Sequence, residues 1–194
     1  MENVNKKSPK GSIKFSITLS EEQKIAKTKI LNHPFNFIVG KAGSGKTLLA
    51  VQIGLDQFFK RHFNKIIITR PTIATEDNGF LPGSEKEKME KEESIELVSL
   101  AHFRGRTFDN SIVIIDEFQN LTRAQLAMVL GRLGKDSMMI LCGDNQQIDL
   151  KDKNYSAINE VAKIIGSNYV NKVILEDNHR HESLIEVLEL LANN

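Results

Sequence analysis

The chain has 194 residues, 40% of them hydrophobic and 26% charged, which suffices for one substantial core, so we expect a single domain. A formal net charge of +1 excludes a global basic field, so contact with nucleic acid would depend on a local patch. The single cysteine, Cys142, excludes an internal disulfide and a cysteine metal cluster. Without a secretory signal or a run of membrane-spanning length, we expect a soluble cytoplasmic protein with no membrane partner.

Residues 1–12, MENVNKKSPKGS, are polar and offer little apolar surface to offset the cost of ordering. We expect a flexible tail there, followed by one folded domain at residues 13–194.

Beyond this tail, short apolar runs alternate with helical patterns. In chain order they predict a strand at 35–39, helix 46–61, strands 65–69, 96–101 and 112–115, helix 122–133, strand 138–142, helix 155–165, strand 171–175 and helix 182–192. This alternation is typical of an α/β fold with three layers, a mainly parallel sheet flanked by helices. In such sheets ligands collect at the carboxyl ends of the strands.

The first predicted strand leads into a phosphate-binding motif. Residues 40–47, GKAGSGKT, match the pattern G-x-x-x-x-G-K-[ST] without substitution. Its glycines let backbone N–H groups converge on phosphates, Lys46 would reach the β- and γ-phosphates, and the Thr47 hydroxyl would hold Mg²⁺. The motif predicts a nucleoside triphosphate site lined by Gly40, Lys41, Ala42, Gly43, Ser44, Gly45, Lys46, Thr47 and Leu48.

Two acids follow the apolar run at 112–115. Asp116 would hold the Mg²⁺ shell, while Glu117, pointing elsewhere, would polarise an attacking water. If Glu117 is a water-activating base, hydrolysis is favoured over transfer to a second substrate.

Three further polar groups have more than one interpretation. Gln147, after the strand at 138–142, presents an amide that would sense a γ-phosphate, although an ordinary turn explains residues 143–149 equally well. Arg70 ends the strand at 65–69 and would contact nucleotide, nucleic acid or a structural acid. Ser20 and Gln23 form a helix capping box, and the Gln23 amide could also pair with an adenine edge. Thr122 and Gln125 form a second capping box, which we interpret as structural.

Taken together, these motifs resemble the PhoH-like ATPases, whose nucleotide domain is similar to the first RecA-like lobe of superfamily 1 helicases. The resemblance runs from about Ser20 to Leu191, with specific matches at 40–47, 69–71, 79–83, 104–107, 116–120, 143–150 and 177–181. It implies ATP and Mg²⁺ as ligands, and it assigns the adenine contact to Gln23, the magnesium and hydrolysis acids to Asp116 and Glu117, and γ-phosphate sensing to Gln147. It also implies that Arg180 touches the γ-phosphate, which spacing alone does not indicate.

The chain departs from the family in two places. The stretch between 79–83 and 104–107 is shorter than in relatives and reduced to a charged segment at 84–97. Phe118 stands where alanine is more usual, which adds bulk beside the acids without changing their chemistry.

The expected function is therefore ATP hydrolysis by a single lobe that couples nucleotide state to RNA or single-stranded DNA. Two-lobed helicases supply an arginine from the second lobe, and this chain is too short for one. We accordingly expect a homo-oligomer, a hexameric ring being one form, in which Arg180 acts on the neighbouring subunit. A small-molecule kinase and a non-hydrolysing, ATP-gated assembly module remain the alternatives.

Overall fold

The computed structural model describes residues 15–71, 94–180 and 183–184. The predicted tail at 1–12 and nearly all of the helix predicted at 182–192 lie outside the described residues.

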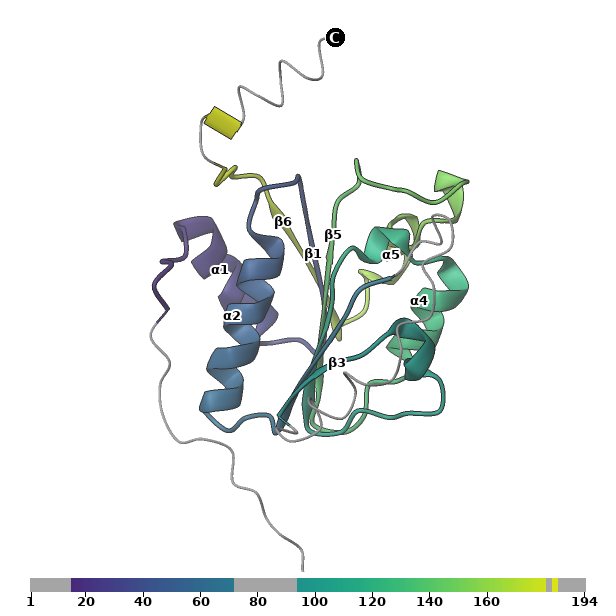
Figure 1. The fold of residues 1–194 in the computed structure, drawn as a ribbon, viewed down its shortest axis with the longest axis horizontal. Helices are drawn as coiled ribbons and strands as arrows, with labels where there is room; N and C mark the ends of the chain where they lie inside the picture. Colours follow the sequence, from purple (N-terminus) through teal and green to yellow (C-terminus); the bar gives the residue numbers. More distant parts are fainter. Residues whose placement is uncertain (1–14, 72–93, 181–182, 185–194) are drawn as a thin grey trace, which may run out of the picture.

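The described chain forms one six-stranded parallel sheet with helices on both faces, as the alternating pattern predicts (Figure 1). The strands lie in the order β3-β2-β4-β5-β1-β6. Their bounds are β1 Phe35–Gly40, β2 Lys65–Thr69, β3 Ile95–Leu97, β4 Ser111–Ile115, β5 Met138–Gly143 and β6 Val170–Leu175. Helices α1 (Glu21–Ile30) and α2 (Lys46–Phe59) cover one face, and α4 (Arg123–Leu130) and α5 (Val161–Ile164) cover the other.

Two apolar clusters hold the three layers together. One packs α1 and α2 against the sheet around Ile38, Ile53 and Ile140, and the other packs α4 and the following turns around Phe37, Val113 and Leu141. Every residue of β4 and β5 is buried because these central strands are covered on both faces, which explains their continuous apolar runs.

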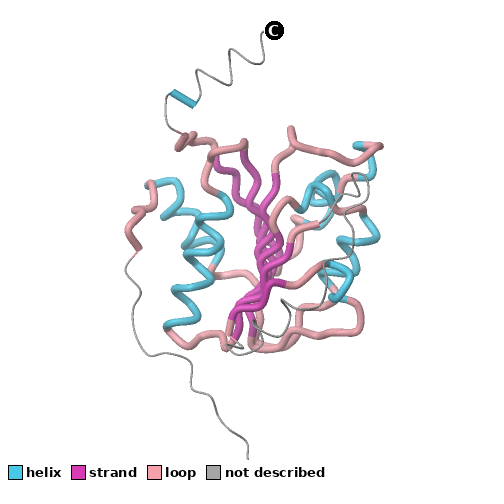
Figure 2. The backbone as a smooth tube through the Cα atoms, in the orientation of Figure 1, coloured by secondary structure: helices cyan, strands magenta, loops and turns pink. Residues whose placement is uncertain are grey.

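Strand register brings three loops to one edge of the sheet. Val39 pairs with Gly143, and Ile115 pairs with Leu141, so β1, β4 and β5 end at the same level. Figure 2 shows the loops that follow these strands emerging at the same end of the sheet. The segments after β1, β4 and β5 are therefore neighbours, although they are far apart in the sequence.

Both capping boxes that the sequence contains are formed. The Ser20 hydroxyl accepts the Gln23 backbone N–H and begins α1, and the Thr122 hydroxyl accepts that of Gln125 and begins α4. In each case the glutamine side chain also accepts the N–H of the capping residue, so two terminal donors are satisfied.

Two predicted elements differ in the structure. The strand expected at 96–101 is the short β3, and the chain then turns through the 3-10 helix η1 (Leu100–Phe103) because Phe103 is drawn into the core. The helix expected at 155–165 is interrupted at Ser156, whose backbone is extended. Its hydroxyl donates to the Gln119 carbonyl, which breaks the segment into η3 (Lys153–Tyr155), η4 (Ala157–Glu160) and α5.

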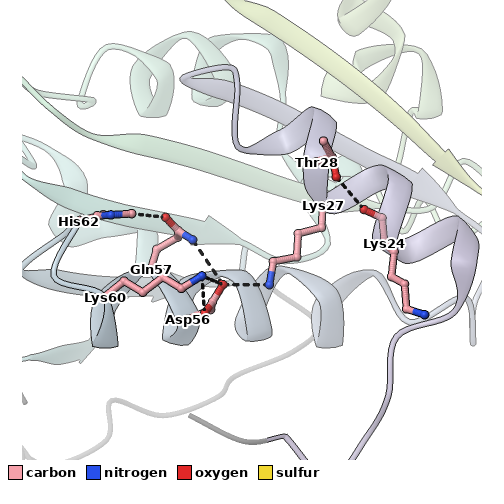
Figure 3. A network of polar contacts seen from close by, with 7 residues as sticks. All are labelled: Lys24, Lys27, Thr28, Asp56, Gln57, Lys60 and His62. Carbon is pink, nitrogen blue, oxygen red and sulfur yellow. Dashed lines mark hydrogen bonds and ion pairs between the residues drawn. The ribbon is translucent and has the colours of Figure 1, made fainter. Parts of the chain in front are cut away.

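A polar network joins the two helices of one face (Figure 3). The Asp56 carboxylate on α2 accepts from Lys27 of α1 at 2.9 Å and from Lys60 at 3.1 Å. Burial raises the pKa of Asp56, but the two ammonium groups outweigh it, so the pKa lies below its ordinary value. Asp56 thus remains charged and fixes α1 against α2.

In the part of the chain that the structure describes, no helix combines the length and apolar character that crossing a bilayer requires.

Candidate nucleotide-binding site

The loop at 40–47 leads from β1 directly into α2. Gly43 and Gly45 have positive φ values of 87° and 79°, a region in which L side chains are strained. Gly45 precedes α2 as its N-cap residue and provides no side-chain cap, so the first backbone N–H groups of the helix stay open to an anion. The Lys46 ammonium donates to the carbonyls of Gly40 and Lys41, at 2.8 and 2.9 Å, and so lies within the loop.

Thr47 and Asp116 meet at this edge of the sheet. The Thr47 hydroxyl donates to an Asp116 carboxylate oxygen at 2.9 Å. Neighbouring ligands of an octahedral Mg²⁺, bound at about 2.0–2.1 Å, are separated by about 2.9 Å. A hydroxyl and a carboxylate are also oxygen donors of the kind that Mg²⁺ prefers, so the pair fits this ion.

Glu117 lies one residue beyond Asp116 and has left-handed backbone geometry, with φ 55° and ψ 39°. One of its carboxylate oxygens accepts from the Gln119 amide at 2.5 Å, and the other lies 3.7 Å from the Arg70 guanidinium. Arg70 thus lies near the expected hydrolysis acid, and its contact with nucleotide or nucleic acid stays a prediction. Phe118 points away into the core, packing edge-to-face on Phe37 with ring centroids 5.4 Å apart.

The loop after β5 is held against these acids. The buried Gln119 amide donates to the Gln147 carbonyl at 2.9 Å and accepts the Asp144 N–H at 3.1 Å. Gln147 itself is exposed at the carboxyl edge, where its predicted sensing role would require it to be.

Three buried side-chain oxygens, among the residues described, have no hydrogen-bond partner: Ser44 Oγ, Thr69 Oγ1 and Asp144 Oδ2. They lie in the loop after β1, at the end of β2 and directly after β5. Buried polar atoms are rarely left unpaired, so their concentration at this edge is what a site for a polar ligand would produce.

Gln23 lies against the loop at 40–47, which we call the phosphate loop. Its carbonyl oxygen accepts the Ser20 N–H at 3.1 Å, and its amide nitrogen donates to the Ser44 carbonyl at 3.2 Å. The amide has capacity for one further donor and one further acceptor bond, which the predicted adenine contact would need.

Arg180 lies beside the phosphate loop of its own chain. A Cβ added to Gly43 would come within 2.6 Å of Arg180 Cγ, and the His179 N–H donates to the Gly43 carbonyl at 3.0 Å. The Glu22 carboxylate accepts the backbone N–H groups of Glu176 and Asp177, at 2.8 and 3.3 Å, and so holds the chain after β6 beside α1. Arg180 therefore lies next to this loop of its own chain, and its action on a neighbouring subunit stays a prediction.

The thiol of Cys142 on β5 is buried and lies within the electrostatic influence of Lys46, Asp116 and Glu117. Burial raises the pKa of its thiol well above the ordinary value, and the negative charge of Asp116 and Glu117 raises it further while Lys46 opposes them. Charges from the loops after β1 and β4 therefore act on one buried atom of the intervening strand.

Sequence reasoning missed Gln119 and Glu22. Gln119 stands two positions after Glu117, which hints at a connected turn, but nothing local indicates that its side chain would be buried. Glu22 precedes Gln23 on α1, and its partners are backbone groups more than 150 positions away, so no local pattern could reveal it.

A family model described as PhoH-like protein matches residues 17–92 and 86–191. A PhoH-like protein of Synechocystis is 36% identical over 183 residues, covering 82% of this chain and 55% of the relative. One from Bacillus subtilis is 35% identical over 199 residues, covering 89% of this chain and 62% of the relative. The chain thus spans little more than half the length of these curated relatives.

Among solved structures, the SWI2/SNF2 ATPase core of Sulfolobus solfataricus, in complex with dsDNA, aligns with a TM-score of 0.50 at 14% identity. The alignment covers 87% of this chain and 46% of that one, and at this identity it bears on the fold alone. The loop at 40–47 lies at the carboxyl edge of a sheet with a P-loop fold, and the chain belongs to the PhoH-like protein family.

Proposed function

We propose that this chain binds ATP with Mg²⁺ and hydrolyses it. The observation that carries the proposal is that two segments lie side by side. The start of α2 bears Lys46 and Thr47, and the end of β4 is followed by Asp116 and Glu117. The hydrogen bond from Thr47 to Asp116 joins the two halves of the site. A loop that presents donors to phosphates and acids that serve metal and water are together the parts that phosphoryl transfer requires.

Binding would begin at the phosphate loop. The open N–H groups at the start of α2 would accept the phosphate oxygens, and the Lys46 ammonium has one donor beyond the two that it gives to loop carbonyls. Mg²⁺, held by Thr47 and Asp116, would offset charge on the β- and γ-phosphates. The Gln23 amide, beside Ser44, would pair with the adenine edge.

Hydrolysis would use Glu117 as the proton acceptor. The water oxygen attacks the γ-phosphorus, and the bond to the bridging oxygen breaks, so that ADP leaves with that electron pair. Glu117 takes the proton of the water, and Gln147 and Arg180 stabilise the γ-phosphoryl oxygens. The products are ADP and inorganic phosphate.

We also propose that nucleotide state is coupled to RNA or single-stranded DNA. The SWI2/SNF2 core, which has a similar fold, is described in complex with dsDNA, and the proposal extends nucleic-acid binding to this chain by analogy of fold. In this chain Arg70 is an exposed cation 3.7 Å from Glu117. A backbone phosphate bound by Arg70 would therefore act on the hydrolysis acid directly.

Assembly into a homo-oligomer, a hexameric ring being one form, remains part of the proposal. The sequence argument assigned Arg180 to the neighbouring subunit, whereas its position beside Gly43 supports action within its own chain.

Steady-state release of phosphate from ATP, measured with and without single-stranded RNA and DNA, tests the proposal. We expect Mg²⁺-dependent turnover with no added acceptor, stimulation by a polynucleotide, and a loss of about 10²–10⁴-fold in Glu117→Gln. Phosphate transfer only to an added small molecule would favour the kinase alternative. If the wild type and Glu117→Gln both assemble with nucleotide and neither hydrolyses ATP, the result would favour the assembly module.

A further inference from the structure

We propose that Gln119 is a positioning residue for hydrolysis, whose buried amide fixes the Glu117 carboxylate and joins it to the loop that bears Gln147. The inference rests on the proposed ATP hydrolysis and deepens it. It adds a physical connection between the residue that takes the proton and the residue that faces the γ-phosphate.

The hydrogen bonds of Gln119 carry the inference. Its two amide N–H groups go to the Glu117 carboxylate at 2.5 Å and to the Gln147 carbonyl at 2.9 Å, and its oxygen accepts the Asp144 N–H at 3.1 Å. The side chain is fully buried. An amide satisfied on both of its ends, away from water, has little freedom to adopt another rotamer, so it defines where its partners lie.

The backbone around Gln119 is anchored as well. Its carbonyl accepts the Ser156 hydroxyl at 2.5 Å, and Phe118 beside it is fully buried. Glu117, in contrast, has the left-handed geometry that non-glycine residues seldom adopt. The buried Gln119 amide fixes one oxygen of its carboxylate at 2.5 Å, whereas the exposed Arg70 lies 3.7 Å from the other.

The bond also distinguishes the two oxygens of Glu117. Oε2 is occupied by Gln119, whereas Oε1 faces the exposed side toward Arg70. Oε1 is therefore the oxygen that is available to a water molecule. Because Gln119 also holds the Gln147 carbonyl, a shift of that loop would move the carboxylate with it.

Asn120 provides a matched control. Its side chain also connects this turn to the loop after β5, through bonds to Asp149 at 3.2 and 2.9 Å, and it is likewise buried. The side-chain hydrogen bonds of Asn120 are with Asp149, whereas Gln119 bonds to Glu117. A role limited to joining the two segments would be shared by both residues, whereas control of Glu117 would belong to Gln119.

The test is a double-mutant cycle in the full-length chain, read as kcat and as the Kd for a fluorescent ATP analogue. Gln119→Met keeps the shape of the side chain and removes its hydrogen bonds. Gln119→Glu keeps an acceptor for the Asp144 N–H and removes the donors to Glu117. We expect each to lower kcat about 10–100-fold, with nucleotide Kd within about twofold of wild type, because a small misplacement of a reacting group costs rate rather than binding.

In a Glu117→Gln background, Gln119→Met should lower kcat no further, because its effect passes through Glu117, while Asn120→Ala should reduce both backgrounds equally. Additive losses for Gln119→Met, or equal effects of Gln119→Met and Asn120→Ala, would overturn the inference. If Gln119→Met does not fold, Gln119→Glu provides the test, and a wild-type kcat in that variant would overturn the inference. An inactive wild type would overturn the proposed function itself, and is distinguished from these outcomes by the parent rate.

Discussion

The hydroxyl of Thr47 donates a hydrogen bond to the carboxylate of Asp116 across 2.9 Å of space and 69 positions of sequence. Thr47 is in the first turn of α2, which follows β1 and its loop, and Asp116 directly follows β4. Strands β1 and β4 are separated in the sheet by β5. Parallel strands of matched register end at one edge, and this is why two residues so distant in the chain come within bonding distance.

The first prediction concerns this pair. Thr47→Ala should lower the apparent affinity for Mg²⁺ about 10–100-fold, because an oxygen next to Asp116 is lost. Thr47→Ser retains the hydroxyl and should stay close to wild type. Titration of ATP turnover with Mg²⁺ measures both variants, and equal behaviour of Ala and Ser would count against a magnesium role for Thr47.

The second prediction concerns where Arg180 acts. Arg180→Ala should lower kcat by about 10³-fold or more if the guanidinium stabilises charge on the transferred phosphoryl group. Mixing this variant with Lys46→Ala should restore no activity, because Arg180 lies beside Gly43 of its own chain. Recovery of turnover in the mixture would instead demonstrate that an arginine from one subunit serves the site of another.

The third prediction concerns Arg70. Its pair with Glu117 has a close match elsewhere, since Arg123 lies the same 3.7 Å from Glu160 and is similarly exposed. Arg70→Ala should reduce stimulation by single-stranded RNA or DNA several-fold and lower the salt dependence of binding by about one unit of slope.

Arg123→Ala is the control for this experiment and should leave both quantities unchanged, because Arg123 on α4 pairs with Glu160 of η4 and not with an acid of the site. Equal stimulation in Arg70→Ala and wild type would remove Arg70 from the proposed nucleic-acid contact.

The fourth prediction concerns the network in Figure 3. Asp56→Asn should destabilise the fold by about 1–2 kcal/mol near neutral pH, because it removes the charged partner of Lys27 and Lys60. The pKa of Asp56 is lower in the folded state, so its stabilising effect is complete above the unfolded value of about 3.9. This stabilisation decreases as the pH falls below the unfolded pKa, and it is lost once the pH is below the folded pKa.

Urea unfolding of Asp56→Asn and wild type at several pH values measures this difference. The free energies of unfolding of the two proteins should differ at pH 7 and become equal in strong acid. Glu21→Gln is the control, since its pair with Lys24 is exposed, and a constant gap for Asp56→Asn at every pH would contradict the assigned role.

The sequence predicted the parts of this protein that depend on local pattern. The strands at 65–69 and 138–142, both capping boxes, and the loop at 40–47 lie where periodicity and motif spacing indicate. Such features are legible because burial on both faces, helix termini and glycine turns each impose a constraint on residues near one another in the chain.

Predictions from local pattern were wrong where a contact with a distant segment determines the backbone conformation. The helix expected at 155–165 is broken because the Ser156 hydroxyl bonds the carbonyl of Gln119, and the strand at 96–101 is short because Phe103 turns into the core. In both cases a tertiary contact outweighs a modest helix or strand preference.

By itself, then, the sequence determined the fold class, a mainly parallel sheet flanked by helices, and the positions of the loop at 40–47 and of two acids after a buried strand. Only the tertiary structure decided that Gln119 holds Glu117, that Arg70 faces the same acid, and that Arg180 lies over its own phosphate loop. The physical reason is that these relationships depend on which strands are neighbours and on their register, and neither is recorded in the spacing of residues along the chain.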